Sequence, residues 1–165
     1  MSRAQVIEIL AEVDRYWASG EARRFAAELG FAPEEQARLA VSVAELASNA
    51  AKHAGRGCIE LSEVKGTGRS GEVVGCRVRA VDAGPGIADV EDALRDGFSE
   101  GRPLTPDTPI SERRGLGYGL GAVCRLMSEV RVFPRSGGGL VIEAVLWQEP
   151  GLVLRNEEDR SCRRA

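Results

Sequence analysis

The sequence predicts an α/β fold, a two-layer sandwich in which helices cover one face of a mixed, largely antiparallel sheet. The predicted elements run strand, two helices, hairpin, short helix, loop, helix and hairpin, unlike the strict strand–helix alternation of a doubly wound parallel sheet. The chain has 165 residues, of which 43% are hydrophobic and 20 are glycine, which suits one globular domain. We therefore expect a single domain over residues 1–150 and a polar tail over residues 151–165.

The first third of the chain predicts one strand and two helices. The β-branched run Val6–Val13 indicates a strand, and a helix is expected over Ser19–Leu29, with Gly30 as its C′ residue. A second helix begins near Pro33, because proline is tolerated in a first turn, and it ends before Gly55. Its apolar face follows helical steps of four and three residues and consists of Leu39, Val43, Leu46 and Ala50.

The middle of the chain predicts a hairpin, a short helix and a long loop. Strands over Cys58–Lys65 and Val73–Asp82 are joined by a turn at Gly66–Glu72. A short helix is expected over Ala88–Arg95. The segment Asp96–Gly117 contains three prolines and few apolar residues, and loops of this length inside compact domains are usually functional.

The last part of the chain predicts a helix and a second hairpin. The helix covers Tyr118–Met127, and the strands Glu129–Phe133 and Leu140–Trp147 are joined by a glycine-rich turn. The final eleven residues, RNEEDRSCRRA, are polar and are expected to fray.

The charge balance excludes several classes of function. There are 22 basic and 25 acidic residues, for a net charge of −3, so no basic surplus points to nucleic acid or to an anionic membrane. No apolar run approaches the roughly 18–20 residues of a membrane span, and acidic residues interrupt the N-terminus where a signal peptide would be apolar. We therefore expect a cytoplasmic protein.

The four cysteines give no sign of a metal or redox site. They are widely scattered and form no C-x-x-C pair, which argues against a metal ribbon or a thioredoxin-type site. We expect three of them, Cys58, Cys76 and Cys124, to be buried apolar thiols. The fourth, Cys162, lies in the polar tail.

Two short motifs place polar groups where they could border a pocket. Glu45 and Asn49 are four residues apart in the second helix and share a face beside its apolar residues. Glutamate can accept a proton and the asparagine oxygen can ligate a hard cation, although a solvated polar pair would look the same. Asp82 ends a predicted strand and is followed by Gly84 and Gly86. A carboxylate there can accept from an exocyclic amine, and an ordinary turn is the alternative interpretation.

A third motif is the segment GLGYGLG at residues 115–121, which opens the last helix. Alternating glycines before a helix leave amide groups exposed, and the helix N-terminus adds positive partial charge, so the segment can cradle phosphate. No lysine follows, which excludes P-loop chemistry. A flexible linker is the alternative, but linkers seldom lead directly into an amphipathic helix.

One motif matches a hydrolase pattern but lacks the structural context that the pattern needs. The segment Gly97–Gly101 matches the G-x-S-x-G pattern of serine hydrolases, but that turn needs a strand before it, a helix after it and a histidine downstream. A short helix is predicted before it and a proline-rich loop after it. The only histidine, His53, lies upstream, so we do not expect an esterase.

The order and spacing of the three motifs resemble the GHKL, or Bergerat-fold, ATPases and kinases. The segments ELGFAPEEQARLAVSVAELASNAAKHAG, AVDAGPGIADVEDALRDGFS and GLGYGLGAVCRLMSEVRV are similar to those of the RsbT-like anti-sigma regulatory serine/threonine kinases, known as switch proteins. The likeness runs from about Ala22 to Trp147. A histidine kinase would need a dimerising helical hairpin with a phosphoacceptor histidine, and there is no room for one before Glu45.

The resemblance implies a role for each matching residue. Glu45 would orient or deprotonate the attacking hydroxyl, and Asn49 would hold Mg²⁺ against the phosphates. Asp82 would accept from the adenine amino group, with Gly84 and Gly86 shaping that wall. The segment that wraps the ATP phosphates would consist of Gly115, Gly117, Tyr118, Gly119, Leu120 and Gly121.

The resemblance also implies a lid over roughly Phe98–Arg114, in which Arg113 or Arg114 is expected to neutralise phosphate charge. The family usually has Gly-x-Gly-Thr near the end of the domain, and its threonine helps to bind the adenine side. This chain has Leu140 at that position, which cannot form a hydrogen bond, and its lid is longer than in the shortest family members. Both departures bear on the affinity for ATP.

The function implied by the resemblance is Mg²⁺- and ATP-dependent phosphorylation of serine or threonine in a STAS-domain partner of a partner-switching circuit. Phosphorylation would release the kinase to engage a phosphatase, another regulator or a sigma factor, through a surface expected to include the helix from Ala22 and the lid. Two alternatives stay open. One is an anti-sigma factor that binds and inhibits a sigma subunit, and the other is a nucleotide-gated binding module without phosphotransfer.

Overall fold

A computed structural model describes residues 3–69, 71–86, 98–99, 102–103 and 119–148 of the chain. The helices and strands are, in chain order, β1 (Ala4–Ile9), α1 (Asp14–Glu28), α2 (Pro33–Ala54), β2 (Gly57–Gly68), β3 (Gly71–Asp82), β4 (Phe98–Ser99), β5 (Arg102–Pro103), α4 (Gly119–Leu126), β6 (Glu129–Pro134) and β7 (Leu140–Trp147).

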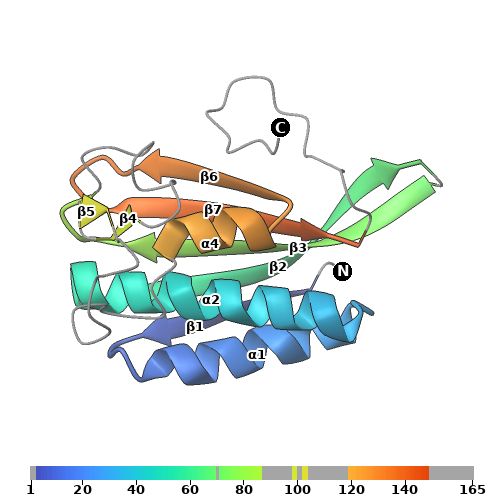
Figure 1. The fold of residues 1–165 in the computed structure, drawn as a ribbon, viewed down its shortest axis with the longest axis horizontal. Helices are drawn as coiled ribbons and strands as arrows, with labels where there is room; N and C mark the ends of the chain where they lie inside the picture. The colour runs from blue at the N-terminus through green and yellow to red at the C-terminus, as the bar shows by residue number, and fades with distance from the viewer. Residues whose placement is uncertain (1–2, 70, 87–97, 100–101, 104–118, 149–165) are drawn as a thin grey trace.

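A five-stranded sheet has the order β1-β2-β3-β7-β6 (Figure 1). Every pairing between its strands is antiparallel, so the described part of the predicted mixed sheet contains no parallel pair. The last described strand, β7, lies between β3 and β6, and its Ala144 is opposite Val78 of β3. The α/β sandwich is confirmed.

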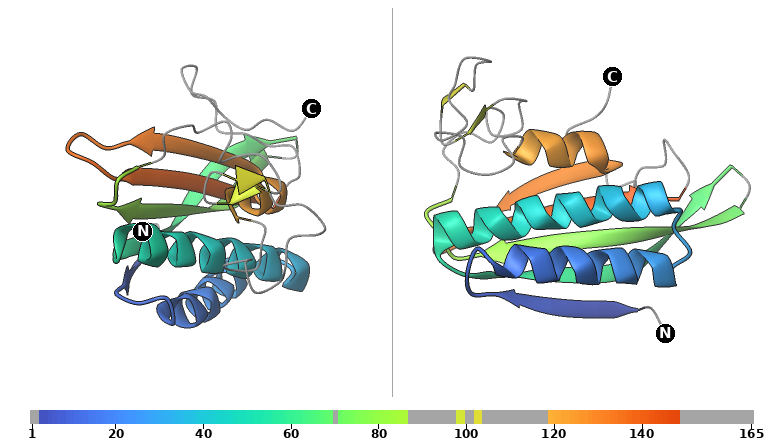
Figure 2. Two further views of the ribbon diagram at one scale, coloured as in Figure 1. Left: turned by 60° about the vertical axis from the view of Figure 1, so that its left-hand side comes forward. Right: turned by 60° about the horizontal axis from the view of Figure 1, so that its bottom comes forward.

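The three described helices lie on one face of the sheet (Figure 2). Alternate residues of each strand point toward them because successive strand side chains face opposite sides of a sheet. The resulting core is a single cluster, in which Ile59 and Val78 of the sheet are fully buried, as are Leu39, Val43 and Leu46 of α2. The predicted apolar face of α2 is therefore confirmed.

The start of the chain differs from the prediction. The first strand covers Ala4–Ile9 and not Val6–Val13, and α1 begins at Asp14 and not at Ser19. The Asp14 carboxylate explains where the strand gives way to the helix. Its Oδ2 accepts hydrogen bonds from the backbone N of Leu10 at 2.8 Å and of Ala11 at 2.9 Å.

The second helix begins and ends as predicted. Pro33 starts it, and the Glu35 carboxylate accepts a hydrogen bond of 2.8 Å from the backbone N of Ala32. Gly55 ends it with a φ of 73°, a left-handed conformation that glycine adopts without a Cβ clash. Lys52 and His53 lie in its last turn, where positive charge suits the helix dipole.

The first hairpin is confirmed, but its strands are longer than predicted. Pairing continues through most of the expected turn at Gly66–Glu72, up to the pair of Gly68 and Gly71. An ion pair of 2.7 Å between Lys65 and Glu72 supports the outer part of this ladder.

The region predicted as a loop contains a short antiparallel pair formed by β4 and β5. Two residues of the hydrolase-like motif, Phe98 and Ser99, form β4. The short helix expected at Ala88–Arg95 and the tail at 151–165 lie outside the described residues. The second hairpin is confirmed, and α4 ends at Leu126, one residue short of the prediction.

The cysteine prediction is right for one of the three described thiols. Cys76 is fully buried, and burial raises its pKa to about 12. Cys58 and Cys124 are only half-buried. Cys58 lies on the face of β2 that points away from the helices, whereas Ile59 and Leu61 of the same strand point into the core. Among the described residues, no helix is both long and apolar enough to cross a membrane.

Candidate functional site

Glu45 and Asn49 lie on one side of α2, next to the apolar face that packs on the sheet. This follows from their spacing, since residues four apart are neighbours on a helix surface. Glu45 is only 7% exposed and Asn49 is half-buried. Neither side chain forms a hydrogen bond with another described residue, so their polar atoms are available to a ligand.

The burial of Glu45 changes its acid–base chemistry. Removal of the carboxylate from water raises its pKa, and the positive charges of Lys52 and Arg15 partly oppose this rise. A carboxylate with a raised pKa is a better proton acceptor near neutral pH than an exposed one.

Lys52 and Arg15 are held beside Glu45 by a third charged residue. Glu12, just before α1, pairs through its Oε1 with Arg15 at 3.3 Å and with Lys52 Nζ at 3.4 Å. The sequence reasoning did not select Lys52. Its spacing could have identified it, because a residue three positions after Asn49 lies on the same side of the helix.

The Asp82–Gly86 segment packs against the C-terminal end of α2. The Asp82 Oδ1 accepts a hydrogen bond of 2.9 Å from the backbone N of Gly84. A Cβ at Gly84 would lie 2.9 Å from the Ala54 Cβ and 3.0 Å from the His53 carbonyl oxygen, so only glycine permits this close approach. The predicted adenine wall therefore adjoins the helix that carries Glu45 and Asn49.

The turn between β6 and β7 closes the same end of the sheet. Arg135 donates a hydrogen bond of 2.7 Å to the Asp82 carbonyl oxygen. Gly139 has a φ of 94° and would overlap that oxygen if it carried a Cβ. The next residue, Leu140, is 7% exposed and begins β7 opposite Pro134. A buried leucine here offers no hydrogen bond to a nucleotide.

Helix α4 begins near the part of α2 that carries Glu45. The two helices run side by side in opposite directions (Figures 1 and 2), and Arg38 of α2 donates a hydrogen bond of 2.9 Å to the Leu126 carbonyl oxygen at the end of α4. Helix α4 has eight residues and is about 12 Å long, and Glu45 lies about 10 Å beyond Arg38 along α2, at a rise of 1.5 Å per residue. The N-terminus of α4 therefore lies toward the part of α2 that carries Glu45.

The glycine-rich motif is described only from Gly119 onward. Gly119 has a φ of 50° and is the first residue of α4. The side chain of Leu120 belongs to the hydrophobic core and Gly121 is buried, so these residues can meet a ligand only through their backbone. Gly115, Gly117 and Tyr118 lie outside the described residues, as do Arg113 and Arg114.

The described residues of the site offer few side-chain ligands for a metal ion. No three His, Cys, Asp or Glu side chains among them gather as a metal site. Asn49 offers one oxygen ligand, and Mg²⁺ commonly binds with one or two protein ligands plus phosphate oxygens and water. The roles of the individual site residues stay predictions.

Two comparisons with known proteins show the family of this chain. A family model described as a histidine kinase-like ATPase domain matches residues 11–146. The chain is 35% identical over 147 residues to the serine/threonine-protein kinase RsbT of Bacillus subtilis (strain 168), an alignment that covers 89% of this chain and 98% of the relative. The resemblance drawn from the sequence is therefore confirmed: the chain belongs to the histidine kinase-like ATPase family and, within it, to the RsbT-like serine/threonine kinases.

Proposed function

We propose that this kinase uses Mg²⁺ and ATP to phosphorylate a serine or threonine of a STAS-domain protein in a partner-switching circuit. The observation that carries the proposal is the state of Glu45, a buried carboxylate with a raised pKa and with no hydrogen bond to a described residue. Burying a carboxylate without such bonds is unfavourable. A catalytic role accounts for its presence on the same side of α2 as Asn49.

Glu45 is the proposed proton acceptor. The hydroxyl oxygen of the protein substrate attacks the γ-phosphorus of ATP, the bond from that phosphorus to the β–γ bridging oxygen breaks, and ADP leaves. The hydroxyl proton passes to the Glu45 carboxylate. Phosphoryl transfer depends mainly on positioning and charge neutralisation, and Lys52 adds a positive charge on the same side of α2.

Asn49 is the proposed protein ligand of the metal, through its side-chain oxygen. Bound Mg²⁺ would neutralise phosphate charge. Asp82, held by its bond to Gly84, is the proposed acceptor for the adenine amino group. The backbone at Gly119 and Gly121 would supply amide groups and the positive end of the α4 dipole to the phosphates.

The proposed circuit follows from the relative. The Bacillus protein is named a serine/threonine-protein kinase, and switch kinases of this kind are expected to be held by a STAS-domain substrate until they phosphorylate it. The released kinase would then engage a phosphatase or another regulator.

Two experiments test this function. Calorimetry with ATP should detect Mg²⁺-dependent binding to the wild type that is lost in Asn49→Ala. Labelled ATP should transfer phosphate to at least one purified STAS-domain protein from the same organism, and Glu45→Ala should abolish transfer while ATP still binds. Transfer that persists in Glu45→Ala would overturn the assigned base, and wild-type protein that binds no ATP would overturn the proposal.

One observation favours a second function, a nucleotide-gated binding module without phosphotransfer. The buried Leu140 replaces the threonine expected in the family and offers no hydrogen bond. ATP binding without transfer to any tested protein would support that module. Inhibition of a purified sigma subunit in the same assays would instead support the anti-sigma alternative.

A further inference from the structure

The start of α1 exposes an unusual concentration of large apolar side chains. Six such side chains are clearly exposed among the described residues, and four of them fall within the eight residues from 10 to 17. We define these four as the α1 patch: Leu10 (65% exposed), Val13 (66%), Tyr16 (65%) and Trp17 (56%). Exposed apolar residues that occur singly need no explanation, but a contiguous cluster marks an interaction site.

Three members of the patch are neighbours at the start of α1. Val13 lies three residues before Tyr16 and four before Trp17, which places the three side chains together. Helix α1 also buries mostly small residues and exposes large aromatic ones. It buries Ala18, Ala22, Phe25 and Ala26, whereas its tyrosine and tryptophan point outward.

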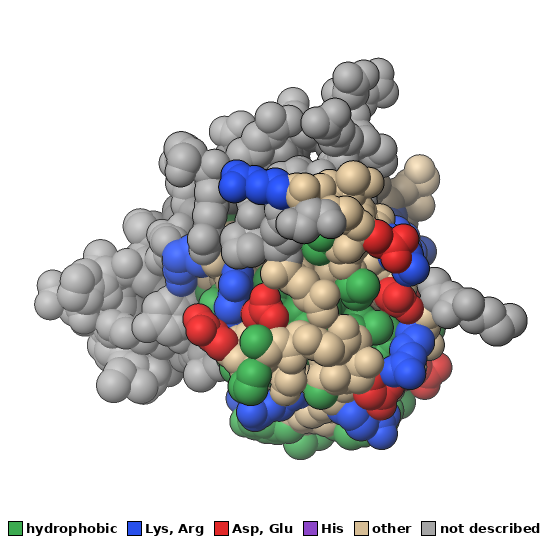
Figure 3. Space-filling model, turned by 90° about the vertical axis from the view of Figure 1, so that its right-hand side faces the viewer, with side chains coloured by type: hydrophobic (Ala, Val, Ile, Leu, Met, Phe, Trp, Pro, Cys, Tyr) green, Lys and Arg blue, Asp and Glu red, His purple; other side chains and the backbone are tan. Residues whose placement is uncertain are grey.

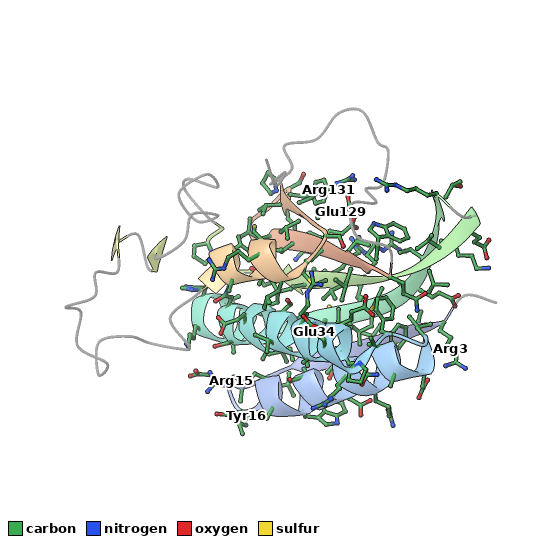
Figure 4. All side chains as sticks on the ribbon, turned by 45° about the vertical axis from the view of Figure 1, so that its right-hand side comes forward. Arg3, Arg15, Tyr16, Glu34, Glu129 and Arg131 are labelled. Carbon is green, nitrogen blue, oxygen red and sulfur yellow. The ribbon has the colours of Figure 1, made fainter. Side chains whose placement is uncertain are left out.

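The Tyr16 ring is held in place before any partner arrives. Figure 4 shows Arg15 and Tyr16 together at the start of α1. The Arg15 guanidinium lies 4.8 Å from the centre of the Tyr16 ring and donates a hydrogen bond of 2.8 Å to its hydroxyl oxygen. A fixed aromatic side chain loses little conformational entropy on binding, which favours it as an anchor in a protein interface.

The patch is connected by ion pairs to the helix that carries the proposed catalytic residue. Arg15, which holds Tyr16, also pairs with Glu12, and Glu12 in turn pairs with Lys52 of α2. The positive charges of Arg15 and Lys52 both act on the Glu45 carboxylate. A protein that covers the patch therefore lies next to the ion-pair network that joins the start of α1 to the helix that carries Glu45.

We propose that the α1 patch is the docking site of the protein that accepts the phosphoryl group. This inference rests on the proposed kinase function. The occupant would be a folded protein that presents an apolar surface beside its acceptor hydroxyl. The small size of the patch favours such a transient contact over a second copy of this chain, because stable interfaces use about 20–30 residues on each side.

The described residues at the opposite end of the molecule offer no comparable surface. Figure 3 shows acidic and basic side chains interspersed with small apolar areas on that face. An exposed apolar residue on the other side of the sheet supplies a matched control. Val6 is 65% exposed and Val13 is 66% exposed, so alanine substitutions at the two positions remove the same side chain from equally exposed places.

The test measures phosphorylation of the STAS-domain protein that the wild type modifies. Trp17→Ala and Val13→Ala should raise KM for that protein, by about tenfold for Trp17→Ala as for an interface anchor. The kcat and the affinity for ATP should stay unchanged, since binding shared by ground and transition states affects KM alone. Val6→Ala should leave all three quantities unchanged.

Other outcomes separate the two proposals. Unchanged KM in both Trp17→Ala and Trp17→Glu, with the proteins shown to be folded by circular dichroism, would overturn the docking site and leave the kinase function standing. A wild type that modifies no STAS-domain protein would overturn the proposed substrate and, with it, this docking proposal. A wild-type dimer in sedimentation that Trp17→Ala converts to a monomer would assign the patch to a second copy and overturn the proposal.

Discussion

The two long helices pack side by side on one face of the sheet but use their residues in opposite ways. Helix α2 buries large aliphatic residues such as Leu39 and Leu46 and also a carboxylate, Glu45. Helix α1 buries mostly alanine and exposes Tyr16 and Trp17. The difference indicates a division of labour, in which α2 provides the core and the proposed chemistry and α1 provides the proposed contact with the substrate.

Each helix also carries one residue in an unfavourable environment, a buried glutamate in α2 and an exposed tryptophan in α1. A buried carboxylate and an exposed tryptophan are both unfavourable for a protein that only has to fold. The tryptophan lies at the start of α1 and the carboxylate in the middle of α2. Arg15, Glu12 and Lys52 link the two places. Departures that are linked in this way are best explained by one function.

Replacement of the buried carboxylate should have the largest effect. Glu45→Gln keeps the shape of the side chain but cannot accept the proton, so the rate of phosphotransfer should fall by about 10²–10⁴-fold. The measurement is a single-turnover assay with labelled ATP at saturating acceptor. Ser42→Ala, which removes a buried hydroxyl on the same helix that bonds to the Arg38 carbonyl oxygen, should keep most of the activity.

Truncation in the core of α2 should lower stability far more than truncation in the α1 patch. Leu46 is fully buried, so Leu46→Ala should reduce the free energy of unfolding by about 2–5 kcal/mol. Trp17→Ala should change it by less than about 0.5 kcal/mol, as for an ordinary surface position. Urea denaturation measures both, and a loss at Trp17 equal to that at Leu46 would contradict the assigned surface role.

The small buried residues of α1 offer a further test. Ala22 is fully buried, so Ala22→Leu should reduce the free energy of unfolding by about 1–3 kcal/mol through overpacking. Ala27 is exposed on the same helix, and Ala27→Leu serves as the control with little expected change. Equal values for the two variants in urea denaturation would show that α1 is not closely packed.

The dependence of the free energy of unfolding on pH should reveal the cost of burying the charged Glu45 carboxylate. Because its pKa in the folded protein is raised above the usual 4.5, its contribution to stability is fully present below that value and is lost as pH rises through the folded pKa. Glu45→Gln has no such loss. The variant should therefore become more stable than the wild type as pH rises above 4.5 toward neutrality, and the gain should be absent below it.

This pH effect is the smallest of the four and the most specific. Denaturation curves of both proteins at several pH values measure it. A stability difference that is constant across the range would show that Glu45 does not titrate differently in the folded state.

The sequence predicted α2 and both hairpins well because their local signals agree with the fold. Pro33, the periodic apolar residues and Gly55 all indicate the same helix, and the antiparallel strands alternate as half-buried strands do. The start of α1 was misplaced for the opposite reason. Val13 and the aromatic residues after it are apolar but exposed, so they broke the helical pattern and suggested a strand.

The sequence predicted which residues form the candidate site but not the ion pairs that surround them. Motif spacing selected Glu45, Asn49 and Asp82. It could not show that Glu12, from a segment without a recognised motif, pairs with Lys52 on the helix that carries Glu45 and Asn49. Such contacts depend on how two helices pack, which no local pattern records.

The position of β7 between β3 and β6 has a consequence for synthesis of the chain. Among the described strands, residues 140–147 are the last to leave the ribosome, yet β6 has no other strand partner in the described sheet. Until they emerge, β3 presents an open edge, which is a template for association with other chains. Nascent chains that stall before residue 140 should therefore be the aggregation-prone species in a cell that makes this protein, and the ones that a ribosome-bound chaperone captures.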